Sequence, residues 1–198
     1  MLQSKTILAH GIAVGALAFI ALASNAQGAF VKLTHPVPLG DESLDLLRSS
    51  GEAGEEQQWK LVVFGFTKCS DICPRSAENL SKLVRIAGEK KIRLGGVFVT
   101  IDPDRDTDTV LDRYTTPLGD NTSFLRLDGE TLDRFKNEFG VEAVFYTKNK
   151  GNQFHYQVDH SSTAFFIDPS GRIRLVFDAL EDIGSAEKML QENQAFFQ

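Results

Sequence analysis

Cys69 and Cys73 are the two cysteines of this chain of 198 residues, and three residues separate them in the stretch FGFTKCSDICPRS. Two sulfur atoms at this spacing can form a disulfide, exchange electrons as thiols or bind one soft metal ion. A purely structural disulfide is the weakest of these interpretations. It would close a very short loop, and the stabilisation that a disulfide gives grows with loop length.

The elements around the cysteines explain why their sulfur atoms could be reactive. Trp59–Phe66 is a short, nearly continuous apolar run, which is typical of a strand buried on both faces. After Pro74 the apolar residues recur with helical spacing, and Gly88 is a candidate for the end of that helix. Ligands of α/β sheets bind beyond the carboxyl ends of strands, and helix N-termini favour anions. The sequence therefore predicts reactive thiols with lowered pKa values.

The rest of the chain continues the alternation of strands and helices. We expect strands at 92–101 and 124–127, and a hairpin of 163–168 with 172–178 around the turn signal DPSG. We expect helices at 130–139 and at 185–197. This order predicts an α/β fold with a mixed sheet and helices on both faces.

The stretch DPDRDT follows the second predicted strand. Asp102, Pro103 and Asp106 are typical of a turn, and Asp106 or Thr107 could cap a short helix. A turn and cap is the interpretation we favour over a direct chemical role.

A metal held by two thiolates needs a third ligand, and the chain has four histidines. His10 lies in an N-terminal apolar segment, and His35 lies where no element is evident. His155 and His160 remain. His160 precedes the predicted strand 163–168, where a loop could return to the cysteine end of the sheet.

Two thiolates and one imidazole, with no obvious fourth donor, suit a soft ion of low coordination number. Cu(I) fits best, because thiolates select it and structural zinc requires four ligands. Beyond the N-terminal segment the one methionine is Met189, in the last predicted helix. That position argues against a blue-copper electron carrier.

Three blocks, FGFTKCSDICP, VFVTIDPDRDT and YQVDHSSTAFFIDPSG, occur in an order that resembles the SCO/SenC family of thioredoxin-fold copper proteins. The resemblance covers the chain from about Trp59 to the C-terminal helix. It implies a thioredoxin-like fold. It also implies a membrane-tethered or exported protein that delivers copper to the dinuclear site of cytochrome c oxidase subunit II, or keeps the cysteines of that site reduced.

The same resemblance assigns the site residues. It implies that Cys69, Cys73 and His160 are the copper ligands. Asp71, between the cysteines, and Asp159, before the histidine, also fall on the motif and are expected beside the metal.

The N-terminus has the pattern of an export signal. Lys5 precedes an apolar run, and the small residues Ser24 and Ala26 follow that run. We expect 1–26 to be a signal peptide or an uncleaved anchor, 27–58 an extension and loop, and 59–198 the copper-binding domain. The expected location is the periplasm or another extracytoplasmic face of a membrane. The formal net charge of -6 and the lack of a basic cluster give no feature for binding nucleic acid.

Two alternatives stay open. A thioredoxin-like thiol–disulfide reductase or peroxide-reducing enzyme could use the same two thiols. The wider cysteine spacing argues against it, as does the lack of a proline between Val158 and Asp168, where such reductases place a cis-proline. The second alternative is an interaction module with a vestigial site. We rank it last because all three metal positions are present.

Overall fold

The computed structural model describes residues 30–51, 57–69, 72–147, 156–178, 180 and 182–198. Six strands form one mixed sheet in the order β1-β8-β7-β2-β3-β4, and β5 and β6 form a separate two-stranded sheet. The strands are β1 Phe30–Pro38, β2 Trp59–Gly65, β3 Leu94–Thr100, β4 Thr122–Leu125, β5 Ala143–Thr147, β6 Tyr156–His160, β7 Ala164–Ile167 and β8 Arg172–Phe177.

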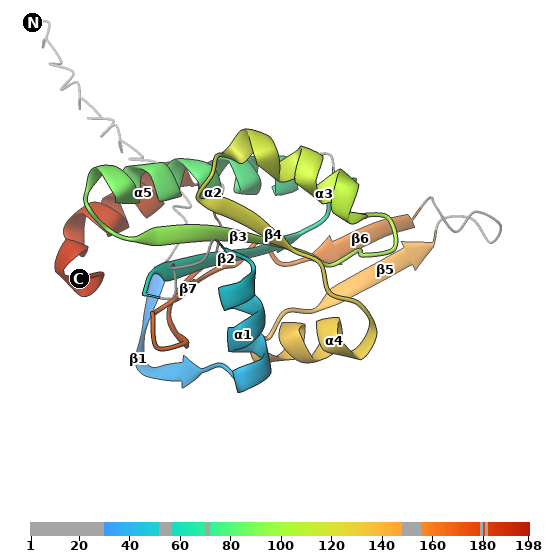
Figure 1. Ribbon diagram of the computed structural model, residues 1–198, viewed down its shortest axis with the longest axis horizontal. Coiled ribbons are helices and arrows are strands. Elements are labelled where there is room, and N and C mark those ends of the chain that lie inside the picture. The colour runs from blue at the N-terminus through green and yellow to red at the C-terminus, as the bar shows by residue number, and fades with distance from the viewer. Residues whose placement is uncertain (1–29, 52–56, 70–71, 148–155, 179, 181) are drawn as a thin grey trace, which may run out of the picture.

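Helices cover both faces of the six-stranded sheet. The α-helices are α1 Asp41–Ser49, α2 Ile72–Glu89, α3 Asp108–Thr115, α4 Gly129–Glu138 and α5 Ile183–Glu192, with 3₁₀ turns at Thr116–Leu118 and Gln194–Phe196. Figure 1 shows α2, α3 and α5 on one side of the sheet and α1 and α4 on the other. The predicted α/β fold with helices on both faces is confirmed, and none of the helices in the described ranges is long and apolar enough to cross a membrane.

The central strands explain why both faces need cover. Every residue of β2 and of β3 is buried. Successive side chains of a strand point to opposite faces, so Leu61 and Val63 enter one core cluster while Val62 and Phe64 enter the other. β2 pairs in parallel with β3 and antiparallel with β7. The continuous apolar run in the sequence is thus a strand between two hydrophobic layers.

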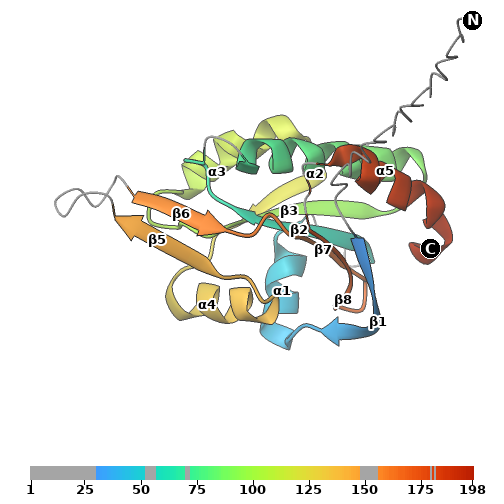
Figure 2. The same cartoon turned by 180° about the vertical axis from the view of Figure 1, so that it is seen from behind.

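Two pairs of elements were not predicted. β1 and α1 occupy residues whose sequence pattern predicts no regular structure, and β1 pairs antiparallel with β8 at the edge of the sheet. β5 and β6 form a hairpin that projects past the end of the sheet (Figures 1 and 2). On β5 three neighbouring apolar side chains are exposed: Val144, Phe145 and Tyr146.

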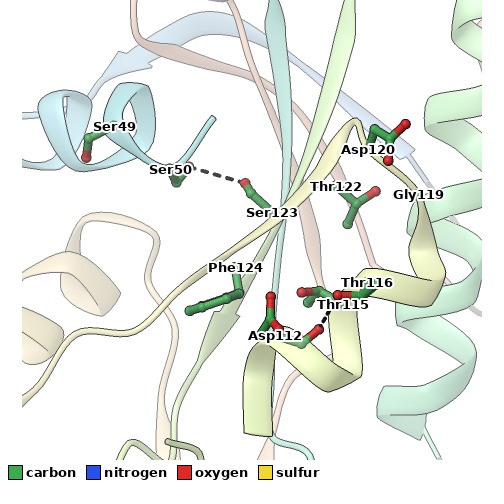
Figure 3. A pocket seen from close by; sticks show the side chains of 10 residues that line it. All are labelled: Ser49, Ser50, Asp112, Thr115, Thr116, Gly119, Asp120, Thr122, Ser123 and Phe124. Atoms are coloured by element: carbon green, nitrogen blue, oxygen red, sulfur yellow. Dashed lines mark hydrogen bonds between the residues drawn. The ribbon is translucent and has the colours of Figure 1, made fainter. Parts of the chain in front are cut away.

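β4 forms the other edge of the sheet, and a pocket of about 430 Å³ lies over it (Figure 3). Hydroxyl groups dominate its lining, and Ser123 of β4 hydrogen-bonds Ser50 at the end of α1 across it. The lining includes neither cysteine and no histidine. This pocket is therefore separate from the predicted site.

An aromatic cluster holds α4 against the sheet. The Phe139 ring centroid lies 5.3 Å from that of Phe64, 5.1 Å from that of Phe165 and 5.0 Å from that of Phe135. Leu132, Phe135 and Phe139 are buried on one side of α4, as predicted, and Gly140 ends the helix with a φ of +64°.

Phe139→Ala should lower the free energy of unfolding by about 3–5 kcal/mol, because it removes a buried ring from this cluster. Urea denaturation followed by circular dichroism measures the change. Phe145→Ala is the matched control, since Phe145 is 47% exposed. Equal losses of stability in the two variants would contradict the packing role of Phe139.

Candidate metal centre

The two cysteines lie where β2 passes into α2, at the carboxyl end of a central strand. β2 ends at Gly65, and α2 begins at Ile72 and carries Cys73 in its first turn. Cys73 is 2% exposed and Cys69 is partly exposed. The two cysteines are not joined by a disulfide. The predicted position of the pair, at the end of a strand and the start of a helix, is confirmed.

His160 reaches this position from the far end of the sequence. Its Nε2 lies 3.3 Å from Sγ of Cys73, a contact between residues 87 positions apart. The sequence pattern predicts a loop at His160. It is instead the last residue of β6, where its backbone pairs with Ala143. The hairpin, rather than a loop, carries the imidazole to the sulfur.

The imidazole is oriented by two further contacts. Nδ1 of His160 lies 2.8 Å from the carbonyl oxygen of Ser161, so Nδ1–H is the donor and Nε2 keeps its lone pair toward Cys73. The ring of Phe66 meets the imidazole edge to face, with centroids 5.8 Å apart. A carbonyl on one ring nitrogen and a soft atom facing the other is the usual arrangement of a metal-binding histidine.

Cys69 plays a different part from Cys73. Its sulfur accepts a hydrogen bond from the backbone N–H of Cys73 at 3.4 Å, so it satisfies one of the free amides at the start of α2. Within the described ranges no three His, Cys, Asp or Glu side chains converge as a ready-made metal site. The structure brings Cys73 and His160 together and leaves Cys69 facing the helix amide.

The predicted lowering of both thiol pKa values is wrong for Cys73. Burial, and after it the hydrogen bond with Cys69, raises the pKa of this thiol from 9.0 to about 12. Removing the thiolate from water outweighs the favourable backbone contacts that the start of a helix provides. Cys73 is thus a protonated thiol at neutral pH in the metal-free protein.

The buried carboxylate of Asp106 fixes the segment before Cys69. It accepts hydrogen bonds from the backbone N–H and the hydroxyl of Thr67, at 3.0 and 2.5 Å, and from the hydroxyl of Thr100 at 2.7 Å. The predicted cap position is right for Thr107, but the expected side-chain cap bond is missing. Thr107 is the N-cap residue of α3 but makes no side-chain cap bond, and Asp106 is fully buried. The carboxylate instead ties the cysteine segment to the end of β3.

The neighbouring Arg105 adds a positive charge to this end of the sheet. Its guanidinium pairs with the buried Asp102 and lies over the ring of Phe66, 5.6 Å from the centroid. The Phe66 ring therefore contacts both the Arg105 guanidinium and the His160 imidazole. The DPDRDT stretch thus contacts and holds residues next to the site. Its position after a strand end could have indicated this role.

Of the two aspartates expected beside the metal, the structure describes Asp159 alone. Asp71 lies outside the described residues. Asp159 is exposed on β6, and successive residues of a strand face opposite sides, so it points away from the side that His160 occupies.

This chain is similar to known proteins in both sequence and fold. The sequence model of the SCO1/SenC family matches residues 46–195. An SCO2-like protein of Rickettsia prowazekii is 33% identical over 150 residues, which cover 72% of this chain and 67% of that protein. The mitochondrial SCO2 homolog of Homo sapiens is 31% identical over 129 residues, 63% of this chain and 47% of that protein. The chain spans about two thirds of the length of the rickettsial relatives, 64% for the protein of Rickettsia felis.

Solved structures agree with the sequence matches. Apo Sco1 of Thermus thermophilus superposes with a TM-score of 0.64 at 26% identity, over 82% of this chain and 94% of that chain. Yeast Sco1 with copper bound superposes with a TM-score of 0.63 at 24% identity, over 83% of this chain and 90% of that chain. The predicted thioredoxin-like fold is confirmed by these neighbours.

The Cys73 thiol should stay protonated until the pH approaches 12 in the reduced, metal-free protein. Its raised pKa means that its contribution to stability is complete below pH 9.0 and is lost as the pH rises toward 12. Ultraviolet thiolate absorbance of Cys69→Ser, which leaves Cys73 as the one thiol, measures this titration. A Cys73 thiolate formed near neutral pH would contradict the effect of burial.

Asp106→Asn should lower the free energy of unfolding by about 2–3 kcal/mol, because an amide cannot accept all the bonds that Thr67 and Thr100 donate. Chemical denaturation of the reduced protein measures the loss. Asp104→Asn, an exposed substitution in the same loop, is the control and should change stability by less than about 0.5 kcal/mol. Equal stability of the two variants would show that Asp106 does not hold the cysteine segment.

Proposed function

The chain belongs to the SCO1/SenC family, and on this basis we propose that it is a copper-binding chaperone that holds Cu(I) through Cys69, Cys73 and His160. The observation that carries the proposal is the 3.3 Å contact between Nε2 of His160 and Sγ of Cys73. An unprotonated imidazole nitrogen and a thiol meet there, and both are donor types that Cu(I) accepts.

The third donor needs a small rearrangement. The sulfur of Cys69 lies 3.4 Å from the backbone nitrogen of Cys73 and is in hydrogen-bonding contact with the Cys73 thiol. A rotation of its side chain exchanges one weak N–H···S bond for a metal–sulfur bond. Cys69 is partly exposed whereas Cys73 is buried, so copper would enter and leave on the Cys69 side.

Proton release accompanies binding in this scheme. Cu(I) binds a thiolate, and Cys73 is protonated at neutral pH because burial raises the pKa of its thiol to about 12. Copper must displace that proton. The Cys73 thiol therefore stays neutral until the ion arrives, which avoids burying an unpaired thiolate charge in the empty protein.

Relatives support copper as the cargo. The structures similar in fold include yeast Sco1 and Bradyrhizobium japonicum ScoI, each described with copper bound. We propose that the recipient is the dinuclear copper site of cytochrome c oxidase subunit II, or another copper-receiving protein.

Export is part of the same proposal. Residues 1–26 would direct the chain across a membrane or hold it there, residues 27–58 would form an extension, and 59–198 the copper-binding domain. A Bacillus anthracis structural neighbour is described as a family lipoprotein, and the zebrafish relative is mitochondrial. These names support a location at the extracytoplasmic face of a membrane.

A thiol–disulfide reductase is the second candidate function, because the two free thiols are in hydrogen-bonding contact. An attacking thiol works best when its pKa is near the ambient pH. The buried Cys73 has a pKa of about 12, so Cys69 would have to be the attacking sulfur. The raised pKa thus favours the chaperone over the enzyme.

His160→Ala should weaken Cu(I) binding by more than about 100-fold, since losing a partner of a metal ligand already costs about 10–100-fold. Anaerobic competition with a coloured Cu(I) chelator measures the affinity, and X-ray absorption should show the nitrogen neighbour lost. His35→Ala on the exposed strand β1 is the matched control. Unchanged affinity in His160→Ala would rule out the imidazole as a ligand, and disulfide reduction at an unchanged rate would favour the enzyme.

A further inference from the structure

A second pocket, of about 590 Å³, lies at the end of the sheet opposite to the cysteines. β2 begins at this pocket with Trp59 and ends toward the cysteines with Gly65, and a strand of 7 residues spans about 20 Å. The turn between α2 and β3, the turn between β7 and β8 and the C-terminal residues enclose the pocket. Its lining includes neither cysteine and no histidine of the described residues. The proposed copper chemistry therefore makes no use of it.

Basic side chains gather in this pocket although the chain as a whole is acidic. Four of them line it: Lys91, Arg93, Arg172 and Arg174. Asp168 is the one acidic side chain of the described lining, and Gln198 adds the carboxylate of the last residue. Four positive and two negative groups leave a formal charge of +2 at the pocket, against -6 for the whole chain. A hollow of this sign attracts anions.

Asp168 holds two of these guanidinium groups side by side. Its Oδ2 accepts hydrogen bonds from Nε of Arg172 at 3.1 Å and from Nη1 of Arg174 at 3.0 Å. Its Oδ1 accepts bonds from the backbone N–H of Arg172 and from the backbone N–H and hydroxyl of Ser170. One carboxylate therefore orients two positive charges and neutralises only one of them. Each guanidinium has five N–H groups, so donors remain for the oxygens of an anion.

Arg174 lowers the stability of the fold at its position. Its guanidinium lies over the Phe196 ring, 4.9 Å from the centroid, and Nζ of Lys32 lies 4.2 Å from the same centroid. The Nε–H of Arg174 is buried and has no hydrogen-bond partner among the described residues. A buried donor without a partner is destabilising, and two cations at one ring repel each other. The guanidinium at this position therefore indicates a role other than stability.

Lys91 gives a second, independent indication of the same kind. It is the one residue other than glycine with a positive φ in the described ranges, at 60°. It follows the end of α2, where its backbone N–H binds the carbonyl of Gly88 and the N–H of Ile92 binds the carbonyl of Ala87. Glycine is the usual residue in this position, because a side chain is strained there. The strained residue is thus one that places an ammonium group in the pocket lining.

We propose that this pocket binds a phosphate group. Arginine pairs with phosphate through two parallel N–H···O bonds, and lysine binds it as a point charge. Arg172 and Arg174 come from β8, and Lys91 and Arg93 come from the turn before β3, so the donors approach from two separate segments. The volume is that of a site for a whole small molecule. The phosphate therefore belongs to a larger compound, either a soluble phosphate ester or the head group of an anionic phospholipid.

The first experiment titrates the reduced, metal-free protein with inorganic pyrophosphate at constant ionic strength. Trp59 is the one tryptophan of the chain and lines the pocket, so its fluorescence should change and saturate. Lys91→Gly should bind pyrophosphate about tenfold more weakly, because one charged donor is gone. The same variant should melt about 2–4 °C higher, because glycine relieves the strain at a positive φ.

Lys90→Gly is the matched control. It removes the same charge one residue earlier, outside the pocket lining, where the backbone N–H still makes helical bonds to Ile86 and Ala87. Its affinity for pyrophosphate should equal that of wild type, and its melting temperature should fall, because glycine weakens the end of a helix. The double variant Lys91→Gly with Arg93→Gln should abolish the saturable fluorescence change.

The second experiment distinguishes the two sources of the phosphate. The full chain is sedimented with vesicles of phosphatidylcholine alone or of phosphatidylcholine mixed with phosphatidylglycerol. All variants have the same N-terminal segment, so a difference between them comes from the pocket. A preference of wild type for phosphatidylglycerol that Lys91→Gly loses would support a lipid head group. Pyrophosphate binding without that preference would support a soluble phosphate compound.

Two results would overturn the proposal. One is a wild type that shows neither a saturable fluorescence change nor a preference for phosphatidylglycerol. The other is equal binding by Lys91→Gly and Lys90→Gly, since the pocket would then add nothing to a general attraction between charges. The copper proposal is tested apart from this one: His160→Ala should bind pyrophosphate as wild type does, whatever its affinity for Cu(I).

Discussion

The contact between His160 and Cys73 is the interaction on which the functional interpretation depends. It joins the last residue of a peripheral hairpin to the first turn of a central helix, 87 residues earlier in the chain. Burying either polar group without a partner would lower the stability of the protein. Together, a neutral imidazole and a neutral thiol satisfy each other, and both are donors to a soft ion. The metal-free protein thus buries the Cys73 sulfur as a protonated thiol and not as a charged thiolate.

The rigidity of the cysteine side comes from the main sheet rather than from the site itself. β2 is buried throughout and is paired on both sides. The Asp106 carboxylate then ties Thr67, just beyond that strand, to Thr100 at the end of β3. Hydrogen bonds to a buried carboxylate are among the stronger polar contacts of a protein interior. The segment that presents Cys69 is therefore anchored before the chain enters α2.

The sequence predicted the parts of the fold whose patterns are local. The apolar run of β2, the helical spacing after Pro74 and the hairpin around DPSG each have a period or turn signal, and each was found. β1 has prolines at 36 and 38 and a register shift between Lys32 and Val37, so no regular alternation marks it. β5 exposes neighbouring apolar residues on both faces, which also removes the alternation that a sheet packed on one face would show.

The site was predictable in its residue types and not in its electrostatics. Spacing and resemblance pointed to Cys73 and His160, yet the burial that raises the pKa of Cys73 comes from the hydrophobic cluster that it shares with residues of β2, β3 and β7, which no local pattern links to the cysteine. The same holds for Asp106, whose role depends on where β2 and β3 end in space.

Among the residues that the structure describes, the hairpin that bears His160 shares no ladder of backbone hydrogen bonds with the six-stranded sheet. Cooperative unfolding of the main sheet and local movement of the hairpin are therefore separate equilibria, because the backbone bonds of one do not hold the other. The backbone amides would then show two levels of protection from hydrogen exchange. Those of β5 and β6 would exchange sooner than those of β2 and β3. Substitutions in the hairpin could therefore change how long the His160 imidazole stays near the Cys73 sulfur. The melting temperature of the whole protein would change little.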